Sequence, residues 1–71
     1  MRVAVLTVSD AGFRGERADT SGDAIASWIA DRGHELADRA IVPDDTVEIV
    51  RALLDWCDSD AVDLVLTTGG T

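Results

Sequence analysis

The 71-residue sequence contains no lysine and only one cysteine. A single cysteine excludes an intrachain disulfide and a zinc site built from clustered cysteines. The six cations are all arginines and stand against 14 acidic residues, which gives a formal net charge of −8. A field of that sign repels nucleic acid and anionic membranes, so we expect neither as a partner. Local backbone dipoles still allow a phosphorylated small molecule to bind.

Long apolar runs are also absent. No segment approaches the ~20 residues of a membrane span, and the start at Met1 shows no pattern of a cleaved leader. We therefore expect a soluble, cytoplasmic protein. Hydrophobic residues make up 46% of the chain, which suits one globular core. A doubly wound α/β domain usually needs about 100 residues or more, so residues 1–71 are expected to be the N-terminal part of a truncated domain with doubtful stability alone.

Five segments carry recognisable secondary-structure patterns. Residues 3–8 form an almost uninterrupted apolar run rich in β-branched residues, which predicts a strand buried on both faces. A polar loop over residues 9–19 follows, and a capping pattern at Thr20 with a stop at Gly33 predicts a helix over 21–32. Residues 36–42 read as an edge strand because Asp38 and Arg39 interrupt them.

The second half of the chain repeats this alternation. Asp45, with Glu48 three residues later, predicts a helix to about Asp58. Its apolar arc is wider than one sheet face requires, so we expect the margin of the arc to meet a second subunit. Residues 62–67 predict a third buried strand. The βαβαβ order predicts a three-layer α/β/α fold, in which a parallel sheet of strand order 2-1-3 carries the two helices on opposite faces.

Ligands of such sheets bind beyond the carboxyl ends of the strands, at the switch point between strands one and three. Three polar segments converge on that edge: residues 7–10, 43–45 and 68–71. Glycines in Thr68-Gly69-Gly70-Thr71 let the backbone approach an anion, although a plain strand-to-helix turn is the alternative. The strand-one loop lacks G-x-G-x-x-G and the chain lacks G-K-[ST], which argues against dinucleotide and P-loop enzymes.

Other candidates each have a structural alternative. Asp44 suits magnesium or the orientation of a phosphate nucleophile, but Pro-Asp is also a common turn pair. Ser9 and Asp10 are candidate ligand contacts or a hydrogen-bonded loop start. Arg14 and Arg17 are candidate phosphate contacts, although solvated loop charges are favoured. By their positions, His34 is assigned to the surface, and Cys57, Trp28 and Trp56 to packing.

Four segments in order resemble the MogA/MoaB family of molybdenum cofactor biosynthesis. They are LTVSD at residues 6–10, DTSG at 19–22 after Gly15, VPDD at 42–45, and DLVLTTGGT at 63–71. The resemblance covers essentially the whole chain. Family members continue past the last segment with an Arg-Asp-Val-Thr-Pro-type motif that carries a second essential aspartate, and that motif is not in this sequence.

The resemblance implies a domain that assembles as a homotrimer and binds molybdopterin. Catalytic members adenylylate molybdopterin with ATP and magnesium. By motif, Asp44 corresponds to a catalytic, metal-positioning aspartate. Thr67, Thr68, Gly69, Gly70 and Thr71 would contact the pterin-phosphate ligand, and Thr7, Ser9 and Asp10 would line the nucleotide side.

Several functions stay open at this point. The leading one is a molybdopterin adenylyltransferase in the full-length parent, with the 71 residues alone inactive. A non-catalytic MoaB-like homologue that binds the pterin is the second, and an inactive truncated fragment is another. A MoeA-like or CinA-like domain is disfavoured, because the CinA-like pattern carries asparagine after the threonine where Ser21 stands here.

Overall fold

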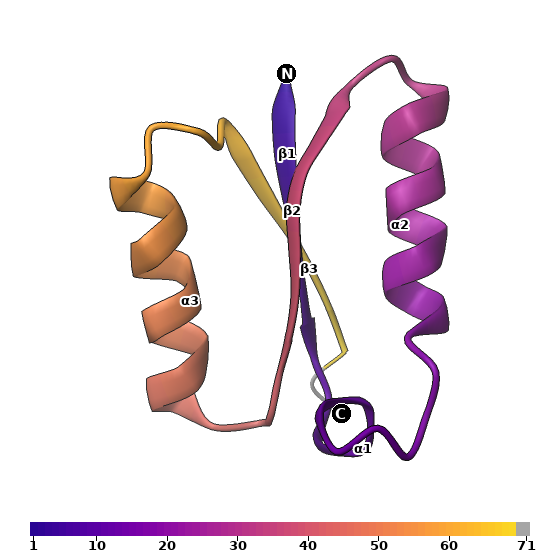
Figure 1. Cartoon of the computed structure of the whole chain (residues 1–71), viewed down its shortest axis with the longest axis vertical. Helices are drawn as coiled ribbons and strands as arrows, with labels where there is room; N and C mark the ends of the chain where they lie inside the picture. Colours follow the sequence, from indigo (N-terminus) through magenta and orange to yellow (C-terminus); the bar gives the residue numbers. More distant parts are fainter. Residues whose placement is uncertain (70–71) are drawn as a thin grey trace.

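The computed structural model describes residues 1–69, which alternate strands and helices along the chain (Figure 1). The elements are β1 (Arg2–Val8), α1 (Asp10–Phe13), α2 (Thr20–Asp31), β2 (Glu35–Val42), α3 (Thr46–Asp58) and β3 (Leu64–Gly69). Within these residues no helix combines the length and apolar character needed to cross a membrane.

The three strands form a parallel sheet in the order β2-β1-β3, with β1 in the centre. Val5 of β1 aligns with Arg39 of β2 on one side and with Leu66 of β3 on the other. Helices α2 and α3 lie on opposite sides of the sheet (Figure 1). The predicted three-layer architecture and the strand order 2-1-3 are therefore confirmed.

Burial of β1 on both faces produces two apolar clusters. Successive side chains of a strand point to opposite faces of its sheet. Ala4 and Leu6 accordingly pack in one cluster with Trp56 of α3, whereas Val3 and Val5 pack in the other with Ile29 of α2. The apolar run over residues 3–6 of β1 thus suits its position between two helical layers.

Some boundaries differ from those predicted. The loop expected over residues 9–19 contains the short helix α1, whose N-cap Ser9 accepts a hydrogen bond from Gly12 N at 3.0 Å. The next helix begins earlier than expected, with Asp19 as its N-cap. At β3 the strand starts at Leu64, two residues later than expected, and runs on to Gly69.

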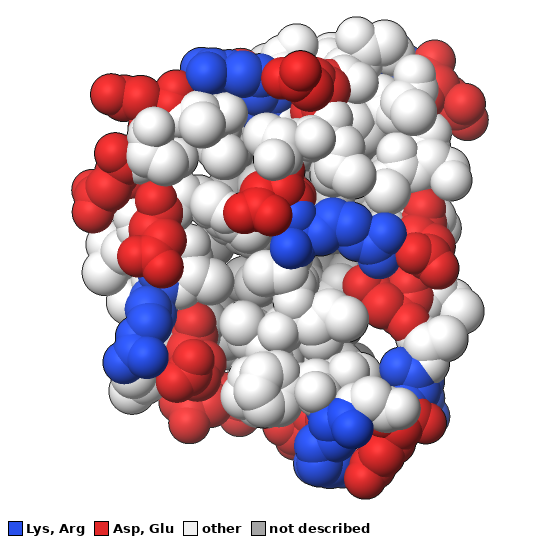
Figure 2. Space-filling model, in the orientation of Figure 1, with Lys and Arg blue, Asp and Glu red and all other residues white. Residues whose placement is uncertain are grey.

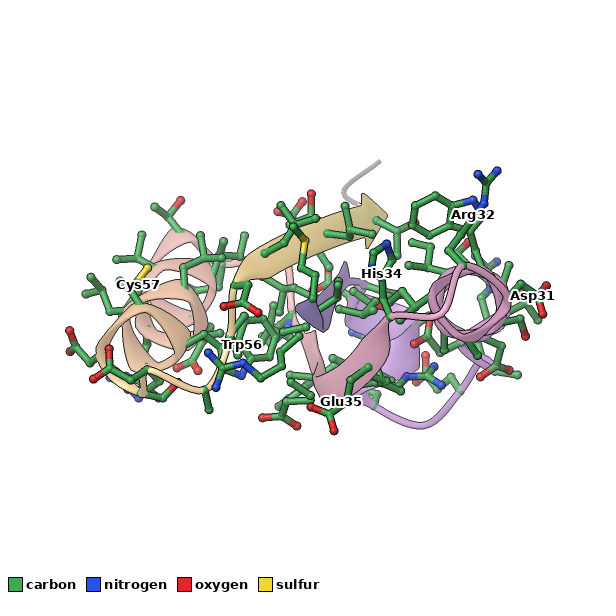
Figure 3. The ribbon with its side chains drawn as sticks, turned by 90° about the horizontal axis from the view of Figure 1, so that it is seen from above. Asp31, Arg32, His34, Glu35, Trp56 and Cys57 are labelled. Carbon is green, nitrogen blue, oxygen red and sulfur yellow. The ribbon has the colours of Figure 1, made fainter. Side chains whose placement is uncertain are left out.

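Two packing assignments were wrong and one was confirmed. Trp56 is buried, and its Nε1 donates to Asp38 Oδ2 at 3.0 Å, which satisfies a polar residue of the edge strand. Cys57, the next residue of α3 (Figure 3), is exposed and not part of the core. Trp28 is also exposed, with the Arg32 guanidinium 5.3 Å from its ring centroid. The helical period shows which residues share the apolar side of a helix, but it does not show how much of that side the sheet covers. Cys57 and Trp28 lie on the part that is not covered.

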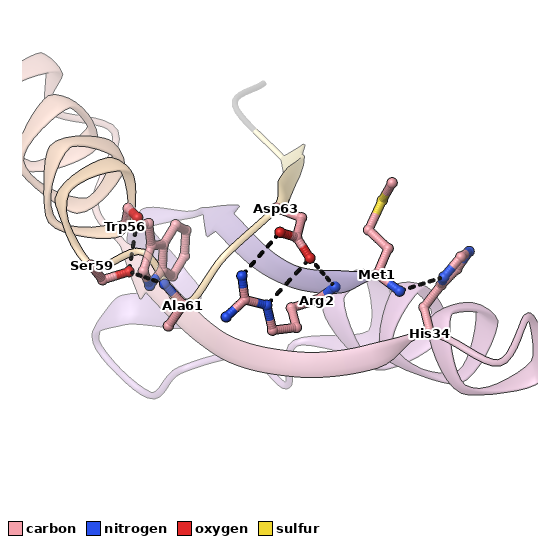
Figure 4. A network of polar contacts seen from close by, with 7 residues as sticks. All are labelled: Met1, Arg2, His34, Trp56, Ser59, Ala61 and Asp63. Carbon is pink, nitrogen blue, oxygen red and sulfur yellow. Dashed lines mark hydrogen bonds and ion pairs between the residues drawn. The ribbon is translucent and has the colours of Figure 1, made fainter.

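At the amino-terminal ends of the strands, polar contacts link the start of β1 to the segment that enters β3 (Figure 4). Arg2 N donates to Asp63 Oδ2 at 2.7 Å, and Arg2 Nη2 contacts Asp63 Oδ1 at 3.1 Å. Both side chains are more than 40% exposed. We name this pair the amino-edge pair.

Candidate functional site

A pocket opens at the carboxyl ends of the strands, next to α1 and the start of α2, with a volume of about 410 Å³. Residues from all three strand exits line it, together with the loop that precedes α2: Thr7, Val8, Ser9, Asp10, Ala11, Gly12, Arg17, Ala18, Asp19, Thr20, Ser21, Asp44 and Gly69. We name it the carboxyl-edge pocket. The structure brings Ser9, Asp10, Asp44 and Gly69 together there, as the sequence predicts.

The exits of β1 and β2 are tied to each other at this pocket. Ser9 N donates to the carbonyl oxygen of Val42 at 2.9 Å, and Asp44 N donates to Asp10 Oδ1, also at 2.9 Å. One oxygen of Asp10 therefore fixes the backbone at Asp44. This contact fits the hydrogen-bonded loop start that the sequence offered as the alternative to a ligand contact for Asp10.

The Asp44 carboxylate is free of the capping role that its position could have given it. Asp45 is the N-cap of α3, and its Oδ1 accepts a hydrogen bond from Val47 N at 2.9 Å. Within residues 1–69, no hydrogen bond or ion pair engages the Asp44 side chain, which is exposed at the pocket. Its carboxylate oxygens are available to a ligand or a metal ion.

Gly69 closes the pocket from β3 with a backbone that suits glycine. Its φ is +90°, and a Cβ there would overlap the carbonyl oxygen of Val8 on the neighbouring strand. Thr67 and Thr68 lie in β3 beside Leu6 and Thr7 and do not line the pocket. Their contact with a ligand stays a prediction, and Gly70 and Thr71 lie outside the described residues.

The sequence reading missed one buried carboxylate in the pocket wall. The Asp19 side chain is 8% exposed and accepts hydrogen bonds from Thr7 Oγ1 at 3.0 Å, Gly22 N at 3.0 Å and Arg39 Nη2 at 2.9 Å. Burial raises the pKa of this carboxyl, but its three donors, Arg39 foremost, outweigh burial and hold the pKa below its ordinary value. Asp19 is therefore ionised at neutral pH. From sequence, its capping position before a helix and its place in the DTSG segment marked Asp19, but neither predicted its contacts with Thr7 and Arg39.

The pocket carries more negative than positive charge. Asp10, Asp19 and Asp44 line it together with a single cation, Arg17, and acidic side chains are spread widely over the visible face of the molecule (Figure 2). Arg14, the other candidate from this loop, instead pairs with Glu16 at 3.0 Å. An anionic ligand therefore needs Arg17, backbone amides or a bound cation to offset these carboxylates.

The donor set fits a magnesium ion that is shared with a ligand. Among residues 1–69, no group of three or more His, Cys, Asp or Glu side chains could enclose a metal. Mg²⁺, however, usually keeps several waters and binds one or two carboxylates together with substrate phosphates. Asp10 and Asp44 supply hard oxygen ligands of this kind in one pocket.

Comparison with known proteins places this geometry in a family. Residues 4–71 match the family described as a probable molybdopterin binding domain. The chain belongs to this family. It is 43% identical over 70 residues to molybdenum cofactor biosynthesis protein B of Escherichia coli K12, covering 99% of this chain and 40% of that protein. It is 46% identical over 67 residues to the molybdopterin adenylyltransferase of Pyrococcus furiosus, covering 94% and 38% of the two chains.

Solved structures of the family share the fold. The molybdopterin biosynthesis enzyme MoaB of Thermus thermophilus superposes with a TM-score of 0.89 at 48% identity, over 99% of this chain and 44% of that one. A CinA protein of Thermoplasma acidophilum gives 0.88 at 26% identity, over 97% and 40%. The predicted membership and fold are confirmed, and relatives of this chain are molybdenum cofactor biosynthesis proteins. The chain spans about 40% of the length of these curated relatives.

Proposed function

We propose that the carboxyl-edge pocket binds molybdopterin, and that the complete gene product containing this chain adenylylates it with ATP and Mg²⁺. One observation carries the proposal: three separate strand exits place Ser9, Asp44 and Gly69 around one pocket. The adenylyltransferase of Pyrococcus furiosus, which is 46% identical over the matched residues, supports this chemistry. We expect the protein to act in the cytoplasm.

The reaction is the transfer of an adenylyl group. An oxygen of the molybdopterin phosphate forms a bond to the α-phosphorus of ATP, the bond to the β-phosphate oxygen breaks, and pyrophosphate leaves. Phosphoryl-type transfer depends mainly on positioning and on neutralising phosphate charge. We assign Asp44 to holding Mg²⁺ and orienting the attacking phosphate, because its carboxylate has no structural partner within residues 1–69. Bound Mg²⁺ would supply the charge neutralisation that this acidic pocket lacks.

The remaining contacts divide between the two substrates. We assign the pterin-phosphate side to residues 67–71, of which Gly69, the last residue of β3, lines the pocket. Thr7 and Ser9, at the exit of β1, are assigned to the nucleotide side together with Asp10, whose second oxygen is not used in fixing Asp44. Arg17 is the cation placed to meet a phosphate.

A binding protein without catalytic activity is the second candidate. Among the relatives, the Escherichia coli protein is named as a biosynthesis protein and not as a transferase. In that case the pocket would bind molybdopterin without adenylyl transfer. Binding and turnover must therefore be measured separately.

We further propose that the complete gene product is a homotrimer and that α3 contributes to contacts between copies. Val47, Val50 and Leu54 form an apolar strip on α3 that is between 45% and 63% exposed. Arg51, Asp55 and Asp58 lie beside this strip around a shallow hollow. An apolar centre with a polar rim is the usual composition of a protein interface. Sedimentation should show a trimer, and Val50→Asp should shift the protein toward monomer; a monomeric parent protein would contradict the assignment.

The test of function uses the complete gene product under anaerobic conditions. Calorimetric titration with molybdopterin measures binding, and release of pyrophosphate from Mg-ATP measures transfer. Binding with turnover supports the transferase, whereas binding without turnover supports the non-catalytic homologue. Absence of binding overturns the proposed function.

The 71 residues expressed alone are expected to be inactive. The structure shows β1 paired on both sides, whereas β3 is paired only with β1 among residues 1–69. An unpaired strand edge favours association. Circular dichroism and the pyrophosphate assay check this expectation, and magnesium-dependent product from a folded 71-residue monomer would contradict it.

A further inference from the structure

The buried Asp19 carboxylate links three elements of the pocket wall. It precedes α2, accepts from Thr7 at the end of β1, and pairs with Arg39 of β2. Thr7 is itself buried, at 4% exposure. The positions of β1, β2 and α2 at the pocket wall therefore depend on the negative charge of Asp19.

The hydrogen bond between Thr7 and Asp19 has only one possible direction. An ionised carboxylate has no proton to donate, so Thr7 Oγ1 must donate to Asp19 Oδ2 across 3.0 Å. The hydroxyl of Thr7 has a single proton. Its oxygen can therefore offer a ligand nothing but an acceptor, which favours a neutral N–H or O–H group over a phosphate oxygen at that position.

The charge of Asp19 is balanced from the other side of the pair. Arg39 Nη2 lies 2.9 Å from Asp19 Oδ2, and Arg39 Nη1 lies 3.0 Å from Asp23 Oδ1. The Asp23 side chain is 68% exposed, so solvent screens it, whereas Asp19 is 8% exposed. The guanidinium thus acts chiefly on the carboxylate that borders the pocket. An unbalanced charge there would repel an anionic ligand.

Gly22 makes room for this arrangement. It is buried in the first turn of α2, and its amide is one of the three donors to Asp19. A Cβ at this position would overlap the Asp19 carboxylate and would lie 2.8 Å from Arg39 Nη2. A side chain at residue 22 would therefore displace the ion pair.

We propose that Asp19 and Arg39 are positioning residues of the carboxyl-edge pocket. Arg39 cancels the charge of the buried Asp19, and Asp19 holds the Thr7 hydroxyl so that Thr7 presents only an acceptor at the nucleotide side of the pocket. This inference rests on the proposed function, because it concerns how the same pocket accepts phosphorylated molybdopterin.

The test measures anaerobic calorimetric binding of molybdopterin to the complete gene product at neutral pH. Arg39→Gln should weaken binding by roughly 10-fold or more, since an uncompensated charge then borders the ligand. The double variant Asp19→Asn, Arg39→Gln removes both charges and should recover most of that loss. Arg39→Lys keeps the charge and should stay within a few-fold of the wild type. Asp23→Asn is the matched control and should bind normally.

A pH series separates charge balance from general damage to the fold. Burial raises the pKa of Asp19, and its hydrogen-bond donors lower it. Without Arg39 only Thr7 and Gly22 remain as donors, so the pKa of Asp19 should rise. Binding by Arg39→Gln should therefore improve relative to the wild type as the pH falls, and the double variant should show no such gain. A purely structural role for Arg39 predicts equal losses at every pH and no recovery in the double variant.

The outcomes distinguish the inference from the proposed function. A wild-type protein that does not bind molybdopterin overturns the function and the inference with it. A wild-type protein that binds, with Arg39→Gln equal to it or the double variant no better than the single one, overturns the inference alone. Should Arg39→Gln fail to fold, Gly22→Ala tests the same pair in a helix that alanine favours; wild-type affinity in a folded Gly22→Ala protein would contradict the inference.

Discussion

The two ends of the sheet each carry an aspartate–arginine pair, and the two pairs differ in what surrounds them. Arg2 and Asp63 at the amino-terminal ends are 45% and 41% exposed (Figure 4). At the carboxyl ends, Arg39 and Asp19 are 32% and 8% exposed, and Asp19 also holds Thr7. Similar contact distances, 3.1 and 2.9 Å, therefore serve different purposes.

Burial explains the difference. Exposed ion pairs contribute little because water solvates each partner when they separate. A buried carboxylate that loses its partner stays uncompensated in the protein, which is far more costly. The amino-edge pair closes one end of the sheet, whereas the pair of Asp19 and Arg39 controls the charge and hydrogen bonding of a pocket. We therefore propose that the amino-edge pair is structural and that the pair of Asp19 and Arg39 serves the pocket.

The largest expected effect is on catalysis at the carboxyl edge. In the complete gene product, Asp44→Asn should lower the rate of adenylyl transfer by roughly 100-fold or more, the usual loss when one charge-stabilising group is removed. Molybdopterin binding should stay largely intact, because Asp44 is assigned to the metal and the nucleophile. Turnover is measured by release of pyrophosphate.

The adjacent acid provides the control. Asp45→Asn keeps a good N-cap on α3, because asparagine and aspartate cap helices about equally well, so its turnover should be normal. Near-normal turnover in Asp44→Asn would contradict the catalytic assignment and would show that Asp44 is a turn residue.

The next effect is on the stability of the pocket backbone. Gly69→Ala should lower the free energy of unfolding by roughly 3 kcal/mol, because the strain of a positive φ, about 1–2 kcal/mol, is joined by overlap with Val8. Gly15→Ala is the matched control, since its φ is +75° but no atom lies within 4 Å of a Cβ there. It should lose about 1 kcal/mol. Equal losses in denaturant unfolding would show that the approach of β3 to β1 is looser than described.

The response to acid sharpens the comparison of the two pairs. The pKa of Asp19 is held below its ordinary value against burial, and Arg2 lowers that of Asp63. Such carboxyls stabilise the fold above their unfolded pKa of about 3.9, and the contribution is lost as pH falls through the lower folded value. Asp19→Asn should therefore reduce the drop in melting temperature between about pH 7 and about pH 3 more than Asp63→Asn does. If Asp63→Asn reduced this drop in melting temperature more than Asp19→Asn, the amino-edge pair would contribute more to stability than the pair of Asp19 and Arg39, which would contradict the account.

The smallest effect belongs to the amino-edge pair. Arg2→Ala should leave turnover unchanged and lower the melting temperature slightly, because the backbone N–H of residue 2 can still donate to Asp63. Added salt should reduce even this difference, since exposed pairs are screened. A salt-independent loss, seen in melting curves at low and high ionic strength, would mean that this end of the sheet matters more than its exposure indicates.

The order of the elements could be predicted from sequence because each pattern is local. The apolar run of β1 and the cap at Asp45 were read correctly, and parallel strands with right-handed crossovers then fix the order 2-1-3. The helix α1 was missed because Asp10–Phe13 is too short to show a helical period.

The chemistry of the pocket could be predicted only in part. Strand exits must meet at one edge, so Ser9, Asp44 and Gly69 were expected together. The contact of Asp19 with Arg39 joins residues 20 positions apart, and no sequence period marks it. Arg39 was read only as a residue that interrupts an edge strand, although its side chain balances the buried carboxylate.

The most direct test of the central claim is a crystal structure of the complete gene product with molybdopterin bound. We expect the ligand in the carboxyl-edge pocket, in contact with Gly69 and beside Asp44. The amino-edge pair, at the other end of the strands, should be unchanged. Molybdopterin bound in the hollow on α3 or near Arg2 and Asp63, with the carboxyl-edge pocket empty, would contradict the account.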